Sequence, residues 1–345
     1  MIGRLCSIFA LTLLLTTTAR AGDDGKLFPT AATIAQTRTI HFTSKLNGEP
    51  FTIHVWEQRG FAGKVPKGGF SVLYLLDGEL YFPFAQFLSN AMPGDSPIIV
   101  GIGHDALNDK AIIARYAKLP ANHKFSVDDS SEAFSILRFL DFTTPVSAGN
   151  RGPKWFGGGG AYTGGDVDTF LKVIETEIKP RVEAMVPINK NDQAIFGHSL
   201  GGFAILRALF TEPHAFRTFI SSSPTIWWNK NEVLKDEAEF AASVRSGAIA
   251  PRVMITAAAE EDEVTISPDY VRSLPPDKAA EITPYVKMIG GWGGMKAQAK
   301  ALGERLEAIQ GKGEYKAKYE LIPGVNHGSE PRVSIWDGLN FAFPK

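Results

Sequence analysis

Short apolar runs recur along this chain, and longer segments with helical periodicity separate them. Phe70–Leu76 and Pro97–Gly101 are apolar almost throughout, as expected of strands buried on both faces. Val167–Ile178 places its apolar residues on one face of a helix. This alternation predicts an α/β domain with a mostly parallel, eight-stranded sheet and helices on both faces. The other expected strands are Thr37–Thr43, Phe51–Glu57, Asp192–Phe196, Thr218–Ser221, Arg252–Ala257 and Tyr315–Ile322.

The first two expected strands alternate in polarity, and Asn47-Gly48 between them suits the turn of an antiparallel pair. Further helices are predicted at Gly201–Phe210 and Lys296–Ile309. Residues 115–165 and 258–294 are predicted to be long loop insertions. Both follow expected strands, so they are predicted to reach the carboxyl edge of the sheet, where α/β proteins bind ligands.

The first 21 residues resemble a secretory signal peptide. A basic start is followed by the apolar run Leu5–Leu15 and by Ala19-Arg20-Ala21, a small-x-small cleavage pattern. We therefore predict a signal peptide over residues 1–21, a mature domain over 22–345, and a periplasmic or secreted protein. The alternative is an N-terminal membrane anchor, although the run is short for a bilayer span and no second segment is long and apolar enough.

Charge and cysteine content exclude several classes of function. The formal net charge is −1, which gives no electrostatic reason to expect nucleic acid or a membrane surface as a partner. The single cysteine, Cys6, lies inside the predicted signal peptide. The mature chain would then have no thiol, which excludes disulfides, a cysteine nucleophile and cysteine metal sites. No histidine spacing suggests a zinc site, and we predict no metal and no cofactor.

The strongest functional motif is Gly197-His198-Ser199-Leu200-Gly201-Gly202, which fits the G-x-S-x-G nucleophile elbow. An expected strand precedes it and an expected helix follows it, as the elbow requires. Such a turn is tight, so Gly197 and Gly201 are predicted to avoid side-chain collisions, and Gly202 to let the helix approach the strands. Ser199 is the predicted nucleophile. The alternative is a glycine-rich turn with an incidental serine.

A serine nucleophile needs a general base, and in this fold type the chain order is serine, acid, histidine. His327 lies far downstream, after the last expected strand and before the last helix, and it is the predicted base. A surface histidine in a polar turn is the alternative. His198 adjoins the serine, but at an elbow it should point away, so we predict a structural role for it. The remaining histidines precede the elbow or lie outside the required position.

The acid that orients the histidine should follow the strand Arg252–Ala257. Four carboxylates compete there, from Glu260 to Glu263. Glu260 is the first choice because the earliest residues of the loop lie nearest the sheet edge, and Glu261 and Asp262 remain alternatives. The oxyanion hole needs two backbone donors. We predict the N–H of Leu200 and the N–H of Glu79, in the loop after the strand Phe70–Leu76.

Several segments in this order resemble the putative esterase family that is related to formylglutathione hydrolases and mycolyltransferases. They are most similar to its enterobactin-type siderophore esterase branch. The resemblance implies an α/β-hydrolase fold, a Ser-His pair with a variable acid, and cleavage of carboxylic esters. It supports the roles predicted for Ser199, His327, Leu200 and Glu79, and it favours Glu260. The segments are Tyr74–Gly78, Asp141–Pro145, Gly158–Ala161, Ile195–Gly202 and Ser223–Trp228.

The sequence thus predicts a secreted serine esterase that forms an acyl-enzyme on Ser199, with a small-molecule ester as its partner. A siderophore-type ester is one candidate substrate. Trp227 and Trp228 follow an expected strand and are candidates for the wall of the substrate pocket, although core packing is the alternative. An acyltransferase with the same site and a catalytically silent binding protein are the rival functions. The sequence leaves the oligomeric state open.

Overall fold

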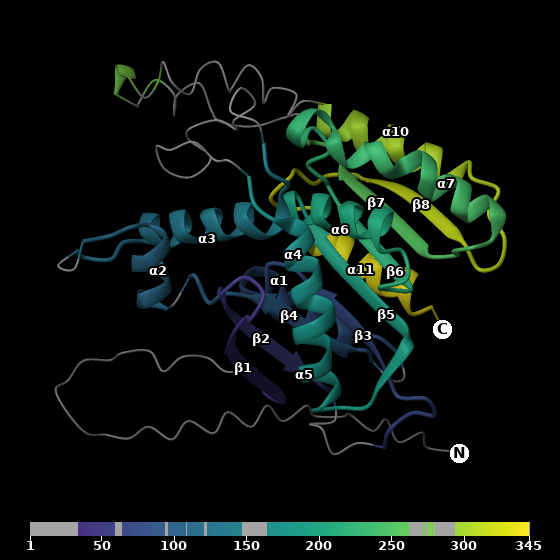
Figure 1. The fold of residues 1–345 in the computed structure, drawn as a ribbon, viewed down its shortest axis with the longest axis horizontal. Coiled ribbons are helices and arrows are strands. Elements are labelled where there is room, and N and C mark those ends of the chain that lie inside the picture. Colours follow the sequence, from purple (N-terminus) through teal and green to yellow (C-terminus); the bar gives the residue numbers. More distant parts are fainter. Residues whose placement is uncertain are drawn as a thin grey trace, which may run out of the picture. The chain divides into compact units, whose positions relative to one another are not determined.

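The computed structural model describes residues 34–58, 64–93, 96–107, 109–120, 123–146, 164–261, 272, 275–277, 279 and 294–344. The chain divides into two units, Met1–Ile34 and Ala35–Lys345, and the second of these carries the predicted α/β domain. The predicted signal peptide, residues 1–21, and most of the predicted insertion 258–294 lie outside the described residues, which Figure 1 draws in grey.

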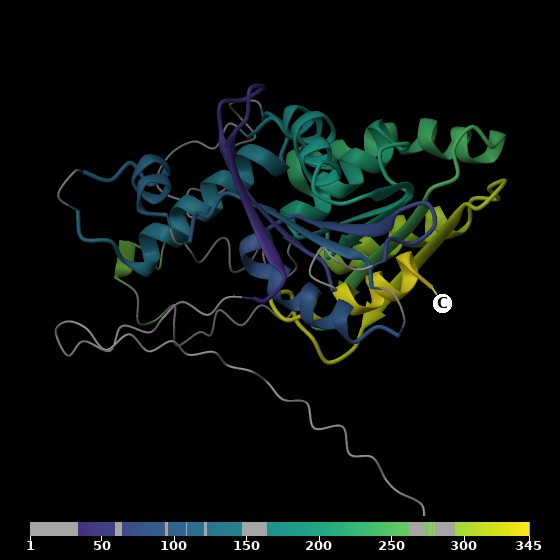
Figure 2. The same ribbon diagram turned by 90° about the horizontal axis from the view of Figure 1, so that it is seen from below.

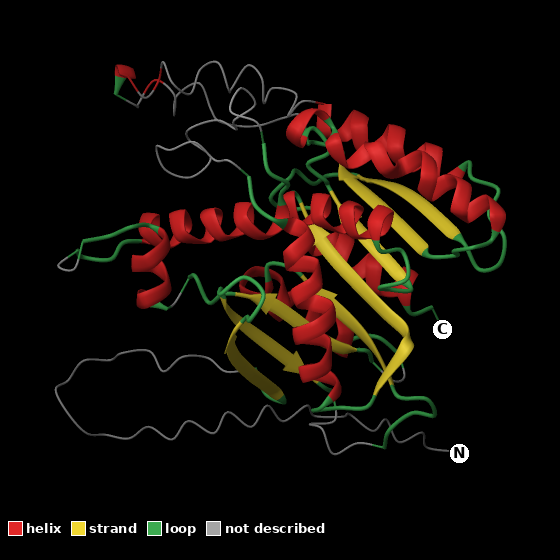
Figure 3. Ribbon diagram, viewed as in Figure 1, coloured by secondary structure: helices red, strands yellow, loops and turns green. Residues whose placement is uncertain are grey.

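An eight-stranded sheet forms the centre of the second unit (Figures 1 and 3). Its strand order is β1-β2-β4-β3-β5-β6-β7-β8. β1 pairs antiparallel with β2, and β2 pairs antiparallel with β4, whereas every other neighbouring pair is parallel. The predicted mostly parallel sheet is therefore confirmed. The strands are β1 Thr37–Thr43, β2 Pro50–Trp56, β3 Phe70–Leu75, β4 Ile98–Gly103, β5 Ile188–His198, β6 Thr218–Ser222, β7 Arg252–Ala258 and β8 Lys316–Ile322.

Burial follows the position of each strand in the sheet. The central strands β4, β6 and β7 are buried along their whole length. Burial on both faces explains the apolar run of β4, whereas β6 also buries Thr218, Ser221 and Ser222. The positions of the outer strands β1 and β8 are intermediate or exposed, apart from the buried Ile322, and β8 carries two lysines. Charged residues on an edge strand protect it from pairing with another chain.

Helices cover both faces of the sheet, as predicted. α1 (Gly78–Asn90) and α11 (Pro331–Ala342) contact each other and pack on one face. The opposite face carries α4 (Val167–Val173), α6 (Leu200–Thr211), α7 (Glu237–Ser246) and α10 (Met295–Glu307), and α4 and α6 lie in front of the strands in Figure 1. The helical segment after α4 is a π-helix, η1 (Ile174–Ile178), followed by α5 (Lys179–Glu183). Two short 3₁₀ helices follow β6, η2 (Trp228–Lys230) and η3 (Glu232–Asp236).

The prediction of a loop over residues 115–165 is wrong in its middle part. Val127–Phe142 forms α3, a 16-residue helix, and it packs against α2 (Lys110–Tyr116). Ser126 and Asp129 form a capping box at its start, which stabilises the first turn. Figure 2, turned by 90°, shows α2 and α3 together at one side of the sheet. Residues 147–163 of the same segment lie outside the described residues.

Among the described residues, no helix combines the length and the apolar character needed to cross a membrane.

Candidate active site

Ser199 occupies a strained turn between β5 and α6. β5 ends at His198 and α6 begins at Leu200, and Ser199 between them has φ 60° and ψ −117°. A positive φ is costly for any residue except glycine, and such strain persists only where the surroundings fix it. One of those surroundings is a hydrogen bond of 2.9 Å from the Ser199 N–H to the Ser222 carbonyl of β6. This is the geometry that the elbow motif predicts.

Two of the three elbow glycines have the predicted steric role. A Cβ at Gly197 would lie 2.4 Å from the carbonyl oxygen of Gly201, and one at Gly202 would lie 2.9 Å from that of Ser222. Both distances are too short for real Cβ contacts. The prediction for Gly201 is wrong, because a Cβ there would meet its nearest atom at 3.6 Å, an ordinary contact.

His327 lies in the loop between β8 and α11, and its Nδ1 is hydrogen-bonded to Glu261 Oε1. Because an ionised carboxylate can only accept, Nδ1 carries the hydrogen of this bond. Proton exchange with a neighbouring hydroxyl then falls to Nε2, as a general base requires. The His327 ring lies against that of His198, with centroids 4.4 Å apart, and His198 directly precedes Ser199 in the chain. The loop therefore brings the histidine to the elbow.

Glu261, and not Glu260, contacts the histidine, which corrects our first choice of acid. The backbone N–H of Glu260 donates to the Val325 carbonyl at 3.1 Å and joins the two loops. The Glu260 side chain is exposed, whereas that of Glu261 is buried beneath His327. The third alternative, Asp262, lies outside the described residues.

Three further contacts hold the Glu261 region in place, two of them on its carboxylate. Its Oε2 accepts a hydrogen bond of 2.7 Å from Ser223 Oγ and one of 3.1 Å from the Ala258 N–H. The Glu261 N–H in turn donates to the Ala258 carbonyl at 3.3 Å. Burial alone would raise the pKa of Glu261, but the hydrogen bond and charge of His327, together with the Ser223 and Ala258 donors, bring that pKa below its ordinary value. The carboxylate is therefore ionised at neutral pH and can stabilise an imidazolium at His327.

His198 is buried against the site rather than turned away from it. Its Nδ1 is hydrogen-bonded to the Tyr81 hydroxyl of α1 at 3.1 Å. Burial lowers the pKa of His198 well below its ordinary value, and the charges of His327 and Arg138 lower it further. A neutral ring thus lies against the proposed base. The structural role predicted for His198 stays a prediction.

The two predicted oxyanion donors lie at the first turns of two helices. Leu200 is the first residue of α6, and Glu79 is the second residue of α1. First-turn N–H groups have no acceptor within their own helix, so they can bind an anion. The loop before Glu79 is buried, and Asp77 in it adopts the left-handed conformation with φ 54° and ψ 48°. That these two groups form the oxyanion hole stays a prediction.

The two tryptophans differ in their surroundings. Trp228 is buried, packs on Phe139 with ring centroids 5.5 Å apart, and donates from Nε1 to the Thr144 carbonyl at 3.2 Å. It therefore belongs to the core, and its proposed role in a pocket wall is wrong. Trp227 is partly buried, and its Nε1 has no hydrogen-bond partner among the described residues. It remains a candidate for contact with substrate.

Ser223, Tyr81 and the ion pair between Asp77 and Arg138 were not predicted from the sequence. Ser223 and Asp77 each follow a strand that ends at the carboxyl edge of the sheet. Their place just after a strand was the sequence signal from which both Ser223 and Asp77 could have been predicted to lie near the site. Arg138 was not found because its segment was predicted to be loop, although the capping box of Ser126 and Asp129 was a signal for its helix.

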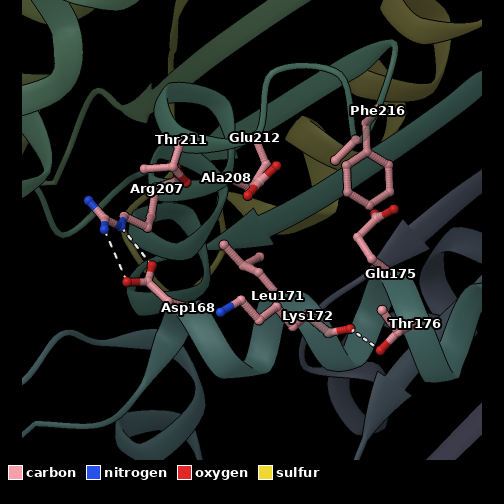
Figure 4. A pocket seen from close by; sticks show the side chains of 11 residues that line it. Asp168, Leu171, Lys172, Glu175, Thr176, Arg207, Ala208, Thr211, Glu212 and Phe216 are labelled. Carbon is pink, nitrogen blue, oxygen red and sulfur yellow. Dashed lines mark hydrogen bonds and ion pairs between the residues drawn. The ribbon is translucent and has the colours of Figure 1, made fainter.

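A cavity of about 390 Å³ lies elsewhere, with α4 and η1 on one side and the second half of α6 on the other (Figure 4). Leu171, Ala208 and Phe216 form its apolar part, and Arg207 at its rim is bound to Asp168. Ala208 is nine residues beyond Ser199 along α6, roughly 13 Å at 1.5 Å per residue. The cavity therefore does not contain the proposed nucleophile, and we assign it no part in the chemistry.

Comparison with known proteins shows similarity to esterases. Residues 157–278, which include the elbow, match the family model described as putative esterase. The ferri-bacillibactin esterase BesA of Bacillus subtilis is 34% identical over 187 residues, 51% of this chain and 54% of that protein. The predicted resemblance to the putative esterase family is confirmed. A second relative, described as a siderophore triacetylfusarinine C esterase of Aspergillus fumigatus, is 30% identical over 205 residues, 56% of this chain and 57% of that protein.

The chain thus spans somewhat more than half the length of these curated relatives. Solved structures extend the likeness to most of the fold. The BES protein from Bacillus cereus superposes with a TM-score of 0.66 at 26% identity, covering 92% of this chain and 99% of the other. The siderophore hydrolase EstB from Aspergillus nidulans gives 0.64 at 20% identity, with the same coverage. The predicted α/β-hydrolase fold is confirmed.

Proposed function

We propose that this protein is a serine hydrolase that cleaves a carboxylic ester through an acyl-enzyme on Ser199. The contact that best supports the proposal is that of His327 Nδ1 with the buried carboxylate of Glu261, on loops that meet beside a strained Ser199. A histidine held in this way has a fixed tautomer and a stabilised charged form, which are the two requirements of a general base.

The reaction follows from the roles of these groups. Ser199 Oγ attacks the ester carbonyl carbon while His327 takes its proton, and the Leu200 and Glu79 N–H groups stabilise the oxyanion. His327 then returns the proton to the alkoxide leaving group as the C–O bond breaks. Water attacks the acyl-enzyme with the same assistance and releases the carboxylic acid and Ser199. No step requires a metal or another cofactor.

The proposed substrate class is a siderophore-type ester. The support for it is that the curated relatives from Bacillus subtilis and Aspergillus fumigatus carry siderophores in their descriptions, although the chain covers only part of each. A periplasmic or secreted location would agree with the signal-peptide pattern of residues 1–21.

The test is hydrolysis of p-nitrophenyl butyrate by the full chain and by Ser199→Ala. Ser246→Ala is a matched control, because Ser246 is exposed at the end of α7. We expect turnover in the wild type and the control, and a loss of at least about 10³-fold in Ser199→Ala. Turnover that survives Ser199→Ala would refute the assignment of the nucleophile. Mass spectrometry of triacetylfusarinine C and ferri-bacillibactin after incubation tests the substrate class, and intact compounds would argue against it.

A further inference from the structure

Arg138 joins the two halves of the proposed oxyanion hole. It extends from α3, and its Nε donates to Asp77 Oδ1 at 2.8 Å. Its Nη2 donates to the His198 carbonyl oxygen at 3.2 Å. Asp77 lies two residues before Glu79, and His198 lies two residues before Leu200. One guanidinium therefore contacts the chain next to each proposed oxyanion donor.

The surroundings make this contact rigid. The Arg138 side chain is 18% exposed and that of Asp77 is 1% exposed. The guanidinium carbon lies 5.6 Å and 5.7 Å from the ring centroids of Phe134 and Phe142, which border it on α3. A planar guanidinium can bind two acceptors at once in a fixed geometry, which an ammonium group cannot do equally well.

The backbone of the Asp77 loop is held by its own hydrogen bonds, since the Asp77 carbonyl accepts from the Leu80 and Tyr81 N–H groups. The Asp77 carboxylate, by contrast, depends on Arg138. The backbone of Asp77 adopts the left-handed conformation, which glycine tolerates better than aspartate does. The Asp77 side chain makes no capping hydrogen bond to α1. Its Oδ2 is buried without a hydrogen-bond partner among the described residues. That oxygen lies 3.6 Å from the position of a Cβ at Gly201, so the loop and the elbow are close neighbours.

We propose that Arg138 is a positioning residue that sets the distance between the Glu79 and Leu200 N–H groups by holding Asp77 to the His198 carbonyl. The inference rests on the proposed esterase function. Oxyanion stabilisation needs both donors at about 2.7–3.1 Å from the developing charge, so a small displacement of one of them weakens the transition state more than the bound ester.

The test is Arg138→Lys, which keeps the charge and loses the two-acceptor geometry. We expect kcat for p-nitrophenyl butyrate to fall about 10- to 100-fold, with KM changed less than about threefold. Benzeneboronic acid forms a tetrahedral boronate when Ser199 Oγ bonds to its boron, and one boronate oxygen then occupies the oxyanion hole. The affinity for this inhibitor should fall in parallel with kcat. Arg207→Lys is the matched control, since Arg207 is also largely buried and bound to two carboxylates, Asp168 and Asp236. It should leave kcat and boronate affinity unchanged.

A second variant controls for misfolding, because a buried Asp77 carboxylate without its partner would destabilise the fold. Asp77→Asn with Arg138→Met removes both charges, so it avoids an isolated buried ion. We expect this double variant to keep a cooperative melting transition and to lose kcat to about the same extent as Arg138→Lys. An unchanged kcat in either folded variant would overturn the proposal. A rise in KM at constant kcat would overturn it in favour of direct substrate binding, and an inactive wild type would instead mean that the proposed function fails.

Discussion

The imidazole of His198 lies against that of His327, with ring centroids 4.4 Å apart and planes inclined by 42°. Two histidines in contact can serve one proposed base only if one of them stays neutral, because two adjacent positive charges repel each other. Burial gives His198 that property by lowering its pKa well below the ordinary value. His327 can then accept a proton without competition from its neighbour.

This burial predicts a pH dependence of stability. As the pH falls below about 6.5, the unfolded chain protonates His198 while the folded chain does not. The free energy of unfolding should therefore decrease by up to about 1.4 kcal/mol per pH unit on this account. His198→Asn removes the group, so its unfolding free energy should decrease less steeply between about pH 6.5 and 5 in urea titrations. His41→Asn, at an exposed position on β1, is the control and should retain the wild-type slope.

The contact of Glu261 with His327 predicts a contrast between two adjacent carboxylates. Glu261→Gln replaces the acceptor with an amide that can hold the wrong tautomer of His327, so kcat should fall roughly 10³- to 10⁴-fold. Glu260→Gln changes an exposed side chain and should stay within about twofold of the wild type. Steady-state hydrolysis of p-nitrophenyl butyrate measures both. The reverse order of effects would restore Glu260 as the acid.

The difference between these two glutamates marks the limit of prediction from sequence. Strand, elbow and helix are local patterns, so Ser199 could be located from its neighbours, and His327 from its place between the last strand and the last helix. Which carboxylate turns inward depends on the pairing of Glu260 N–H with the Val325 carbonyl, 65 residues away along the chain. The periodicity of apolar residues in the sequence cannot predict such a long-range contact.

α3 was missed for a different reason. Its capping box, Ser126 and Asp129, is visible in the sequence, but its apolar residues do not form a clear stripe. The helix buries parts of several faces, against α2, α4 and α6. Because Arg138 contacts Asp77 from this helix across 61 residues of chain, the link between the helix and the oxyanion loop could be found only in three dimensions.

The buried pair of His104 and Asp141 predicts a second pH effect. Burial lowers the pKa of His104, but the charge and hydrogen bond of Asp141, with the charge of Glu79, raise it to about 9 overall. A histidine with a raised folded-state pKa stabilises the fold fully below about pH 6.5, and that contribution is lost as the pH rises through about 9. The shift corresponds to about 3 kcal/mol. Chemical denaturation of His104→Gln between about pH 6.5 and 9.5 should show a flatter profile than the wild type, and parallel profiles would contradict the pairing.

Glu330 predicts a further pH effect with the same sign, because it is a carboxyl group for which the folded state disfavours ionisation. It is fully buried, and its two oxygens contact the hydroxyls of Ser222 and Thr256, with Ser334 Oγ at 3.2 Å. Burial raises the pKa of Glu330 to about 7, and the hydrogen bonds of Ser222 and Thr256 only partly oppose it.

Its stabilising contribution is therefore complete below about pH 4.5 and is lost as the pH rises through about 7. Glu330→Gln imitates the neutral carboxyl group and can keep hydrogen bonds with these hydroxyls, since an amide both donates and accepts. The variant should match the wild type at about pH 4.5 and exceed its unfolding free energy by up to about 3 kcal/mol at about pH 8. Glu260→Gln is the exposed control and should show no such change between the two pH values. Equal destabilisation of Glu330→Gln at both pH values would contradict the prediction. It would mean that the variant loses hydrogen-bond geometry and that ionisation of Glu330 does not affect stability.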